Sequence, residues 1–311
     1  MDNRAEVRQF LMSRRAKVTP QAVGLPAGTG RRVAGLRRSE VAMLAGVSVE
    51  YYAKLERGAI AGASASVLDA LARALQLDET ERVHLLDLAR AADGIPTSGR
   101  PRRRSAPRAG IRPSLQWALE SLTHGVAFVR DQHHDLLATN ALGRAFFSPI
   151  IGEADAGGSP SGIWVADPTG PGRVPNLARF QFLDPVAKDF YPDWELFARM
   201  CVGIMRADAG RDPHDAAMQD LVGELSTCSD LFRTLWGQHD VRTHGAGVKR
   251  YRHPVVGAVS LAYEELAITA EPGCVLLVYT AEPGSESAER LRLLASWQAS
   301  QGAGALSRDE S

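Results

Sequence analysis

A proline- and arginine-rich segment divides the chain into two parts that cannot share one continuous helix or strand. Residues 95–113 read IPTSGRPRRRSAPRAGIRP, with four prolines, two glycines and no apolar periodicity. Proline lacks an amide donor and disfavours helix in the residue before it, so this segment is typical of a linker. It predicts one domain over 1–94, a second over 114–285, and a C-terminal helix and tail over 286–311.

The net charge of zero hides a difference between these parts. Residues 1–110 contain 19 Lys and Arg against 11 Asp and Glu, a net charge of +8. Residues 111–311 contain the remaining 17 and 25, a net charge of −8. A basic N-terminal third predicts a polyanion as partner, and uneven surface charge without a partner is the alternative.

Composition argues against several classes of protein. No apolar run reaches the roughly 18 residues that a membrane helix needs, and Met1–Glu6 is charged where a signal peptide is apolar. The three cysteines, Cys201, Cys228 and Cys274, are far apart and odd in number, which argues against a disulfide framework or a zinc site. We therefore expect a soluble cytoplasmic protein with no membrane association and no metal or other cofactor.

The N-terminal part is patterned as five helices. Apolar residues recur at helical spacing from Val7, stop over the glycine- and proline-rich residues 17–35, and return at Leu36. Asp78, with Glu81 three residues later, predicts the capping box of the last of these helices.

Residues 36–58, LRRSEVAMLAGVSVEYYAKLERG, have the pattern of two short helices joined by a tight turn. Ala42 is small enough for the helices to cross closely, and Gly46 can adopt the left-handed conformation that ends the first helix. Ser48 is a good N-cap for the second helix. A helix presented in this way fits the major groove of DNA, which is about 12 Å wide.

This interpretation predicts a set of contacts with DNA. Tyr51 and Tyr52 are adjacent and cannot share a helix face, so we expect Tyr51 to be exposed and Tyr52 to be buried. Glu50 has two interpretations, as an acceptor from cytosine N4 or as a first-turn acid that favours the helix dipole. The arginines are expected to contact the DNA backbone. The predicted DNA-binding residues are Arg31, Arg32, Arg37, Arg38, Ser48, Val49, Glu50, Tyr51, Lys54 and Arg57.

At these positions the sequence resembles the xenobiotic-response-element (XRE) family of lambda-repressor-like helix-turn-helix regulators. The matching residues are Ala42, Gly46, Val47, Ser48, Leu55, Glu56 and Gly58. The resemblance implies that positions 49, 50, 51 and 54 face bases or backbone and that Arg38 meets a phosphate. Because helix-turn-helix modules gain specificity by pairing half-sites about one helical turn apart, we expect a homodimer on double-stranded DNA.

The C-terminal part mixes strands with helices. Strands are predicted over 125–130, 136–139, 248–253, 258–264 and 274–280, and helices over 140–147, from about 185 to 208, and from Asp212-Pro213 onward. This order predicts an α+β domain with an antiparallel sheet.

Catalytic and metal-binding signatures are absent from the C-terminal sequence. It contains neither a GxSxG elbow nor a GxxxxGK[ST] phosphate loop. His239 and His244 are five residues apart, which is not the spacing of a metal-binding pair on one helix face. His133 and His134 are expected in a solvent-facing turn. We expect no catalytic residues.

Several stretches of the C-terminal half resemble the MmyB-like regulators. They are NLARFQFLDPVAKDFYPDW over 176–194, GRDP over 210–213, LWGQHDV over 235–241, RHP over 252–254 and VYTAEPG over 278–284. That family joins an XRE-type domain to a PAS-like ligand-binding domain, and the resemblance covers about residues 5–285. It implies an antiparallel sheet flanked by helices around an apolar cavity, with a fatty-acid-like ligand. Residues 148–175 are the least typical.

The residues themselves indicate a pocket less directly, because an aromatic-rich stripe is also typical of a packed core. A bound acyl carboxylate would need a cation, since an unpaired buried charge is costly, and Arg179 and Arg206 are the candidates. The predicted ligand-binding residues are Phe128, Phe146, Phe147, Arg179, Phe180, Trp194, Phe197, Met200, Ile204 and Arg206.

The sequence as a whole predicts a nucleoid-associated, sequence-specific transcriptional regulator that senses a fatty-acid-like small molecule and is not an enzyme. The expected fold is a five-helix lambda-repressor-like domain followed by a PAS-like α+β domain. One alternative makes the second domain a protein-partner or dimerisation module without a ligand. The other, a fused enzyme domain, would need a nucleophile–base pair, and the sequence offers none.

Overall fold

The computed structural model describes residues 3–26, 33–94, 111–152, 163–167, 173–242 and 245–306, with side chains up to residue 300. Arg31, Arg32 and residues 95–110 of the predicted linker lie outside the described residues. The chain forms two units, one of residues 1–101 with 200–243 and one of residues 102–199 with 244–311.

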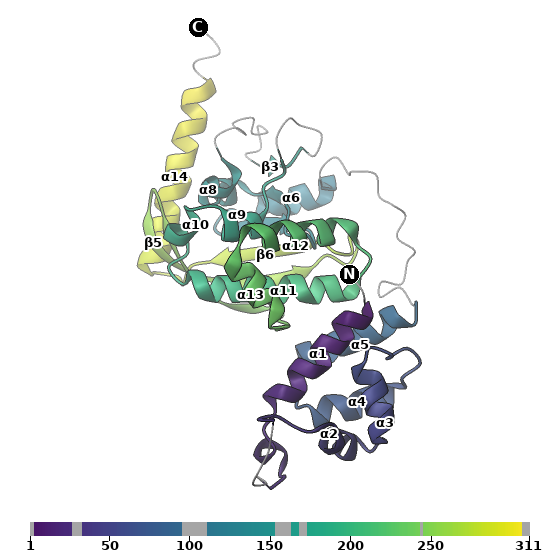
Figure 1. Ribbon diagram of the computed structural model, residues 1–311. Coiled ribbons are helices and arrows are strands. Elements are labelled where there is room, and N and C mark those ends of the chain that lie inside the picture. The colour runs from purple at the N-terminus through teal and green to yellow at the C-terminus, as the bar shows by residue number, and fades with distance from the viewer. Residues whose placement is uncertain are drawn as a thin grey trace. The chain divides into compact units, whose positions relative to one another are not determined.

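The N-terminal part of the first unit consists of helices packed on one apolar core (Figure 1), and its described residues form the five α-helices that were predicted. They are α1 (Asn3–Lys17), α2 (Arg38–Ala45), α3 (Val49–Glu56), α4 (Ala65–Ala74) and α5 (Glu79–Ala92), with a short 3₁₀ helix at Gln21–Val23. Val7, Phe10 and Leu11 of α1 are completely buried in this core. The capping box of α5 is present, since the Asp78 carboxylate accepts from the Glu81 N–H (2.8 Å) and the Glu81 carboxylate from the Asp78 N–H (3.2 Å).

Residues 200–243 pack with the first unit, and they lie inside the range 114–285 that the sequence predicts as the second domain. They include α11 (Trp194–Arg211) from Met200 onward, α12 (Ala216–Cys228) and α13 (Asp230–Gly237). Two apolar side chains of this segment, Ala207 and Val241, join the core of the N-terminal helices. These two side chains therefore extend the core formed by the apolar residues of α1 and α5.

A buried group of charged side chains links α11 to α1. The Arg206 guanidinium, 1% exposed, pairs with the Glu6 carboxylate, and the His239 imidazole lies 3.4 Å from the same carboxylate. Burial by itself raises the pKa of Glu6, but the hydrogen bond to His239 and the charge of Arg206 outweigh burial and lower that pKa to about 2. Glu6 is therefore an ion inside the first unit.

The second unit contains an antiparallel sheet, as predicted, with six strands in the described residues where five were expected. The strand order is β3 (Trp164–Val165), β2 (Leu136–Thr139), β1 (Val126–Arg130), β6 (Val275–Thr280), β5 (Gly257–Ala267) and β4 (Ala246–His253). In register, Phe128 of β1 lies between Thr139 of β2 and Leu277 of β6, and Tyr263 of β5 pairs with Tyr279 of β6.

The central strand β1 is buried on both faces. Ala127 and Val129 share a cluster with Leu115 and Leu119 of α6 (Pro113–Ser121). Because side chains alternate along a strand, Phe128 points to the opposite face. There it meets an aromatic cluster, to which α7 (Ala141–Phe146), α9 (Leu177–Leu183) and α10 (Ala187–Phe190) contribute rings.

Two more helices complete this unit. The short α8 (Ser148–Ile151) follows α7, and α14 (Glu286–Leu306) is the predicted C-terminal helix. Figure 1 shows α14 rising beside β5, where the Ser260 N–H donates to the Ser287 hydroxyl (3.0 Å).

Two predicted helix boundaries and one predicted linker boundary differ from the structure, each at a proline. The helix expected over 185–208 is interrupted after α10, because Pro192 disfavours helix at Tyr191, whose backbone is extended (φ −107°, ψ 94°). Pro113 does not close the linker but begins α6, where its missing N–H costs nothing. The helix expected from Pro213 begins at Ala216, capped by the Asp215 carboxylate.

The histidine prediction is also partly wrong. His134 lies in the turn between β1 and β2 as expected, but it is only 4% exposed, because Leu177 and the preceding residues lie across that turn. The Leu177 N–H donates to the His134 carbonyl (2.9 Å), which fixes this covering segment.

Candidate functional site

The turn between α2 and α3 has the sharp bend that the sequence predicted. Gly46 is left-handed (φ 67°, ψ 32°), and its N–H points to the carbonyl oxygens of Ala42 and Met43. A Cβ at Gly46 would meet no atom within 4 Å, so the backbone angle and not lack of space calls for glycine here. Ala42 is completely buried, which allows the two helices to pack closely.

The start of α3 is capped and its outer side is exposed. The Ser48 hydroxyl accepts from the Tyr51 N–H (3.0 Å), as expected of an N-cap. Val49 (41% exposed), Glu50 and Lys54 face solvent. Tyr52 is fully buried as predicted, whereas Tyr51 is half-buried and packs against the edge of the core, so it is less exposed than expected.

A buried carboxylate, Glu56 at the end of α3, organises the arginines around this face. It accepts from Arg15 Nε of α1 (2.5 Å) and from Arg38 Nε at the start of α2, and the Tyr52 hydroxyl lies 3.4 Å away. Burial opposes ionisation, but the two guanidinium groups outweigh it and lower the pKa of Glu56. Sequence reasoning assigned no role to Glu56, although its spacing of four from the inward Tyr52 placed it on the buried side of the helix.

Three cations of this face are not neutralised. Within the described part of the chain, the side chains of Arg37, Lys54 and Arg57 are exposed and form no ion pair with a carboxylate. Arg38 is half-exposed and is oriented by Glu56. The helix pair therefore presents a row of positive charge beside the exposed start of α3, as binding to a polyanion requires.

Five of the predicted ligand-binding residues meet in the aromatic cluster of the second unit. Phe128 stands edge-on to Phe147 (4.9 Å between centroids), and Phe147 is edge-on to Phe146 (5.2 Å). Phe180 and Phe197 belong to the same cluster, which also contains rings that sequence reasoning did not assign to a ligand: Phe190, Tyr191, Tyr251, His253 and Tyr279. These rings bury one another.

Four of the remaining predicted ligand-binding residues have other partners or belong to the first unit. Trp194 Nε1 donates to the Gln181 carbonyl (2.9 Å), and Arg179 lies 3.9 Å from the Asp135 carboxylate. Met200 and Ile204 are part of the first unit.

The prediction that Arg206 meets a ligand carboxylate needs correction. Its guanidinium already pairs with Glu6 inside the first unit and lies over the Trp236 ring (4.0 Å). Its partner Glu6 lies 200 positions earlier in the chain, so no local pattern in the sequence indicated this pair.

A different cation lies at the aromatic cluster. Lys249 of β4 is half-buried, and its ammonium donates to the Tyr279 hydroxyl (3.1 Å). The same nitrogen lies 4.4 Å from the centroid of Tyr263 and 5.3 Å from that of Phe197. The signal that could have identified it is strand alternation, which places Lys249 and the buried Tyr251 on the same face of the sheet.

Two family profiles match the chain, and the one for the second domain includes residues 200–243, which pack with the first unit. The profile of the MmyB-like transcription regulator ligand binding domain matches residues 111–294, more than half of the chain, and a helix-turn-helix domain profile matches residues 12–85. The chain belongs to the MmyB-like transcription regulators. It is thus a DNA-binding transcription regulator with a ligand-binding domain. No curated protein matches it.

The residues described for this MmyB-like regulator contain no helix long and apolar enough to cross a membrane. In the same ranges no three His, Cys, Asp or Glu side chains gather in the way that metal ligands do.

Proposed function

We propose that this MmyB-like regulator recognises a specific duplex by inserting the start of α3 into the major groove. The observation that carries the proposal is the bend at Gly46, which leaves the capped first turns of α3 exposed. Val49, Glu50, Tyr51 and Lys54 are the side chains that reach base edges. Ser48 caps the helix, and Arg37, Arg38 and Arg57 hold the backbone on either side.

The half-buried position of Tyr51 and the ion pair of Arg38 refine these roles. Tyr51 presents an edge that core contacts hold in place, so it contributes shape and one hydroxyl group. Arg38 serves both Glu56 and a phosphate, so its removal would disturb the fold as well as DNA binding. Arg37, whose side chain makes no ion pair within the described residues, is the cleaner probe of a phosphate contact.

The test begins with selection of preferred duplexes from a random library by the full-length protein. Lys54→Ala should change the selected sequence, whereas Arg37→Ala should weaken all duplexes by a similar factor and reduce the salt-dependence slope by about 0.9. Selection of the same sequence by Lys54→Ala would contradict the assignment of α3 as the reading helix.

The proposed ligand of the second unit is an amphipathic, fatty-acid-like small molecule. The aromatic cluster offers apolar contact, and Lys249 with the Tyr279 hydroxyl supplies a cation and a donor for a carboxylate. A ligand can change DNA affinity only if it binds two arrangements of the protein unequally. A homodimer acting on two half-sites, in the cytoplasm on the nucleoid, completes the proposal.

Native mass spectrometry of the purified protein tests both of these points. We expect twice the mass of the chain, with an additional small-molecule mass that denaturation releases. A dimer without any extractable lipid would favour the alternative in which this domain only mediates protein association.

A further inference from the structure

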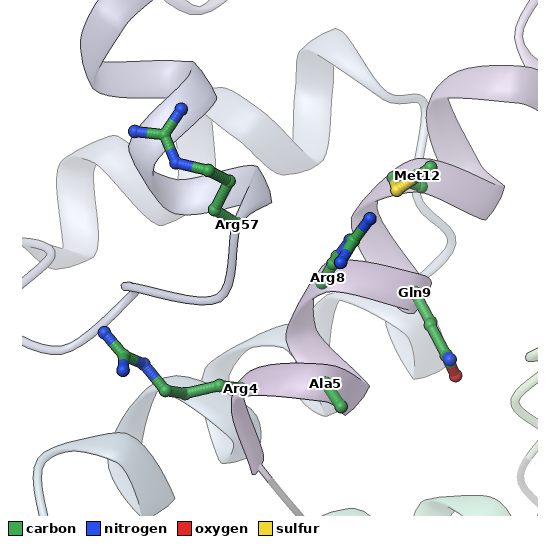
Figure 2. A pocket seen from close by; sticks show the side chains of 6 residues that line it. All are labelled: Arg4, Ala5, Arg8, Gln9, Met12 and Arg57. Atoms are coloured by element: carbon green, nitrogen blue, oxygen red, sulfur yellow. The ribbon is translucent and has the colours of Figure 1, made fainter.

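The surface of α1 beside the end of α3 contains a basic hollow that the recognition helix does not account for. Its volume is about 500 Å³, and Figure 2 shows its lining: Arg4, Ala5, Arg8, Gln9 and Met12 of α1, and Arg57 just after α3. Among these lining residues, three are arginines and none is acidic. The hollow is therefore a concave surface with a strong positive charge.

The sequence of α1 separates this basic face from the buried one. Arg4, Arg8 and Met12 recur every four residues and so share one exposed face of the helix. Glu6, which stands between the two arginines in the sequence, points to the buried face and pairs with Arg206. The carboxylate that would otherwise neutralise the hollow is thus turned away from it.

A close backbone approach brings Arg57 to this face. A Cβ at Gly58 would lie 2.2 Å from the Arg4 carbonyl oxygen, so only glycine lets the chain leaving α3 lie against the first turn of α1. Arg57, the preceding residue, is held beside Arg4 as a result. Glu50, Lys54 and Arg57 follow one another at spacings of four and three, so the hollow continues the exposed side of α3.

Two arginines of the hollow, Arg8 and Arg57, differ from Arg14 and Arg15 of α1. Arg14 lies 2.9 Å from the Glu81 carboxylate and Arg15 lies 2.5 Å from that of Glu56. Arg8 and Arg57 have no such partner within the described residues. Every polar side chain of the lining can donate a hydrogen bond to an anion, because the fourth polar residue, Gln9, carries an amide.

We infer that this hollow binds the sugar–phosphate backbone of the duplex beyond the bases that α3 reads. The inference rests on the proposed DNA recognition and extends its footprint onto α1. A DNA backbone fits because it offers regularly spaced anions that accept from several guanidinium groups at once, and because the hollow continues the exposed side of α3. The contact carries no sequence information of its own.

The experiment measures binding of the full-length protein to its selected duplex and to a scrambled duplex of equal length, over a range of salt concentrations. Arg4→Gln/Arg8→Gln should reduce the salt-dependence slope by about two and weaken both duplexes by the same factor, roughly tenfold. Arg8→Gln alone should reduce the slope by about one. Arg73→Gln is the matched control, since Arg73 is exposed on α4, outside the hollow, and has no ion pair within the described residues.

The outcomes separate this inference from the proposed recognition. If wild type does not distinguish the two duplexes, recognition by α3 fails, and the slopes still test the hollow because backbone contacts occur on either duplex. If Arg8→Gln and the double variant match Arg73→Gln in slope and affinity, the hollow does not bind DNA. An effect confined to the selected duplex would also overturn the inference. So would variants of the hollow that bind both duplexes as wild type does but no longer bind an acidic peptide.

Discussion

In the first unit, Glu6, His84 and Arg206 are buried as polar or charged groups, whereas the second unit buries aromatic rings against one another. Around Phe146, for example, Phe147, Phe190 and Tyr251 lie at centroid distances of 5.2, 5.8 and 5.0 Å. Burial of a charge is favourable only when a partner occupies one precise position, whereas rings can repack with little loss. The first unit should therefore tolerate fewer changes of arrangement than the second.

This difference fits the two functions. A DNA-reading helix must be held in one orientation, and the Arg206–Glu6 pair fixes α1, on which α3 packs, to α11. A site for an apolar ligand benefits from rings that can shift to admit it. The comparison predicts that charge changes at the buried Arg206–Glu6 pair are costly and that a charge change beside the aromatic cluster of the second unit costs little.

The largest expected effect comes from breaking the buried ion pair. Arg206→Met leaves the buried Glu6 carboxylate with His239 alone and should lower the free energy of unfolding by about 3–5 kcal/mol. Glu6→Gln/Arg206→Met removes both charges and should recover most of that loss. Chemical denaturation of the full chain, analysed as a double-mutant cycle, measures the coupling between the two residues.

Lys17→Met provides the control, because it removes a charge from an exposed pair with Asp240, in which the side chains are 51% and 37% exposed. It should cost less than about 1 kcal/mol. Equal losses for Arg206→Met and Lys17→Met would show that burial does not set the cost of losing a charge in the first unit.

The next effect is a pH dependence that arises from His84. Burial lowers the pKa of this imidazole to about 3, and no hydrogen-bond partner satisfies either ring nitrogen in the described part of the chain. Glu6, Arg206, Arg14 and His239 are the charged or titratable groups that act on it. Because the unfolded chain binds this proton near pH 6.5 and the folded chain does not, stability should fall as pH decreases below about 6.5, by about 1.4 kcal/mol per pH unit.

Hydrogen exchange of the α1 and α5 amides between about pH 6.5 and 5 measures this slope in the first unit, above the range in which Glu6 takes up a proton. His84→Leu should flatten it. Among the buried histidines of the second unit, burial also lowers the pKa of His253, and exchange in β4 reports that group separately. An unchanged slope in α1 and α5 of His84→Leu would refute the assignment.

The parts of the fold that the sequence predicted correctly depend on contacts between near neighbours. The cap at Ser48, the turn at Gly46 and the capping box at Asp78 each involve residues at most four positions apart. The signals for these features are local, because a side chain or a backbone angle satisfies groups within the same turn. The break at Tyr191 was also a local signal, but the continuing apolar stripe obscured the effect of Pro192.

The contacts that the sequence did not reveal join distant positions. Arg206 meets Glu6 across 200 residues, and Lys249 meets Tyr279 across 30. No periodicity specifies such a pair, since the partner depends on how the elements pack. This is why the aromatic residues of the cluster could be predicted as a group while the cations assigned to them, Arg179 and Arg206, proved to have other partners.

The smallest effect on stability is expected at the cation of the aromatic unit. Lys249→Met removes contacts with Tyr263 and Tyr279 that are worth about 0.5–1 kcal/mol in a half-exposed position, so the fold should persist. If this ammonium binds the ligand carboxylate, affinity for dodecanoate should fall at least tenfold, because a charge-assisted hydrogen bond is worth about 1.5–3 kcal/mol. Titration calorimetry of the full-length protein measures this change.

Two controls make the result specific to Lys249. Lys188→Met removes another ammonium that lies over a ring, 4.9 Å from the Trp194 centroid, and should leave dodecanoate binding unchanged. Dodecanol, which has the same chain without the carboxylate, should bind Lys249→Met and wild type equally. Equal weakening of both compounds would mean that Lys249 supports the packing of the rings and does not pair with the charge of a ligand. The ligand site would then depend on ring packing alone, like the rest of the aromatic cluster.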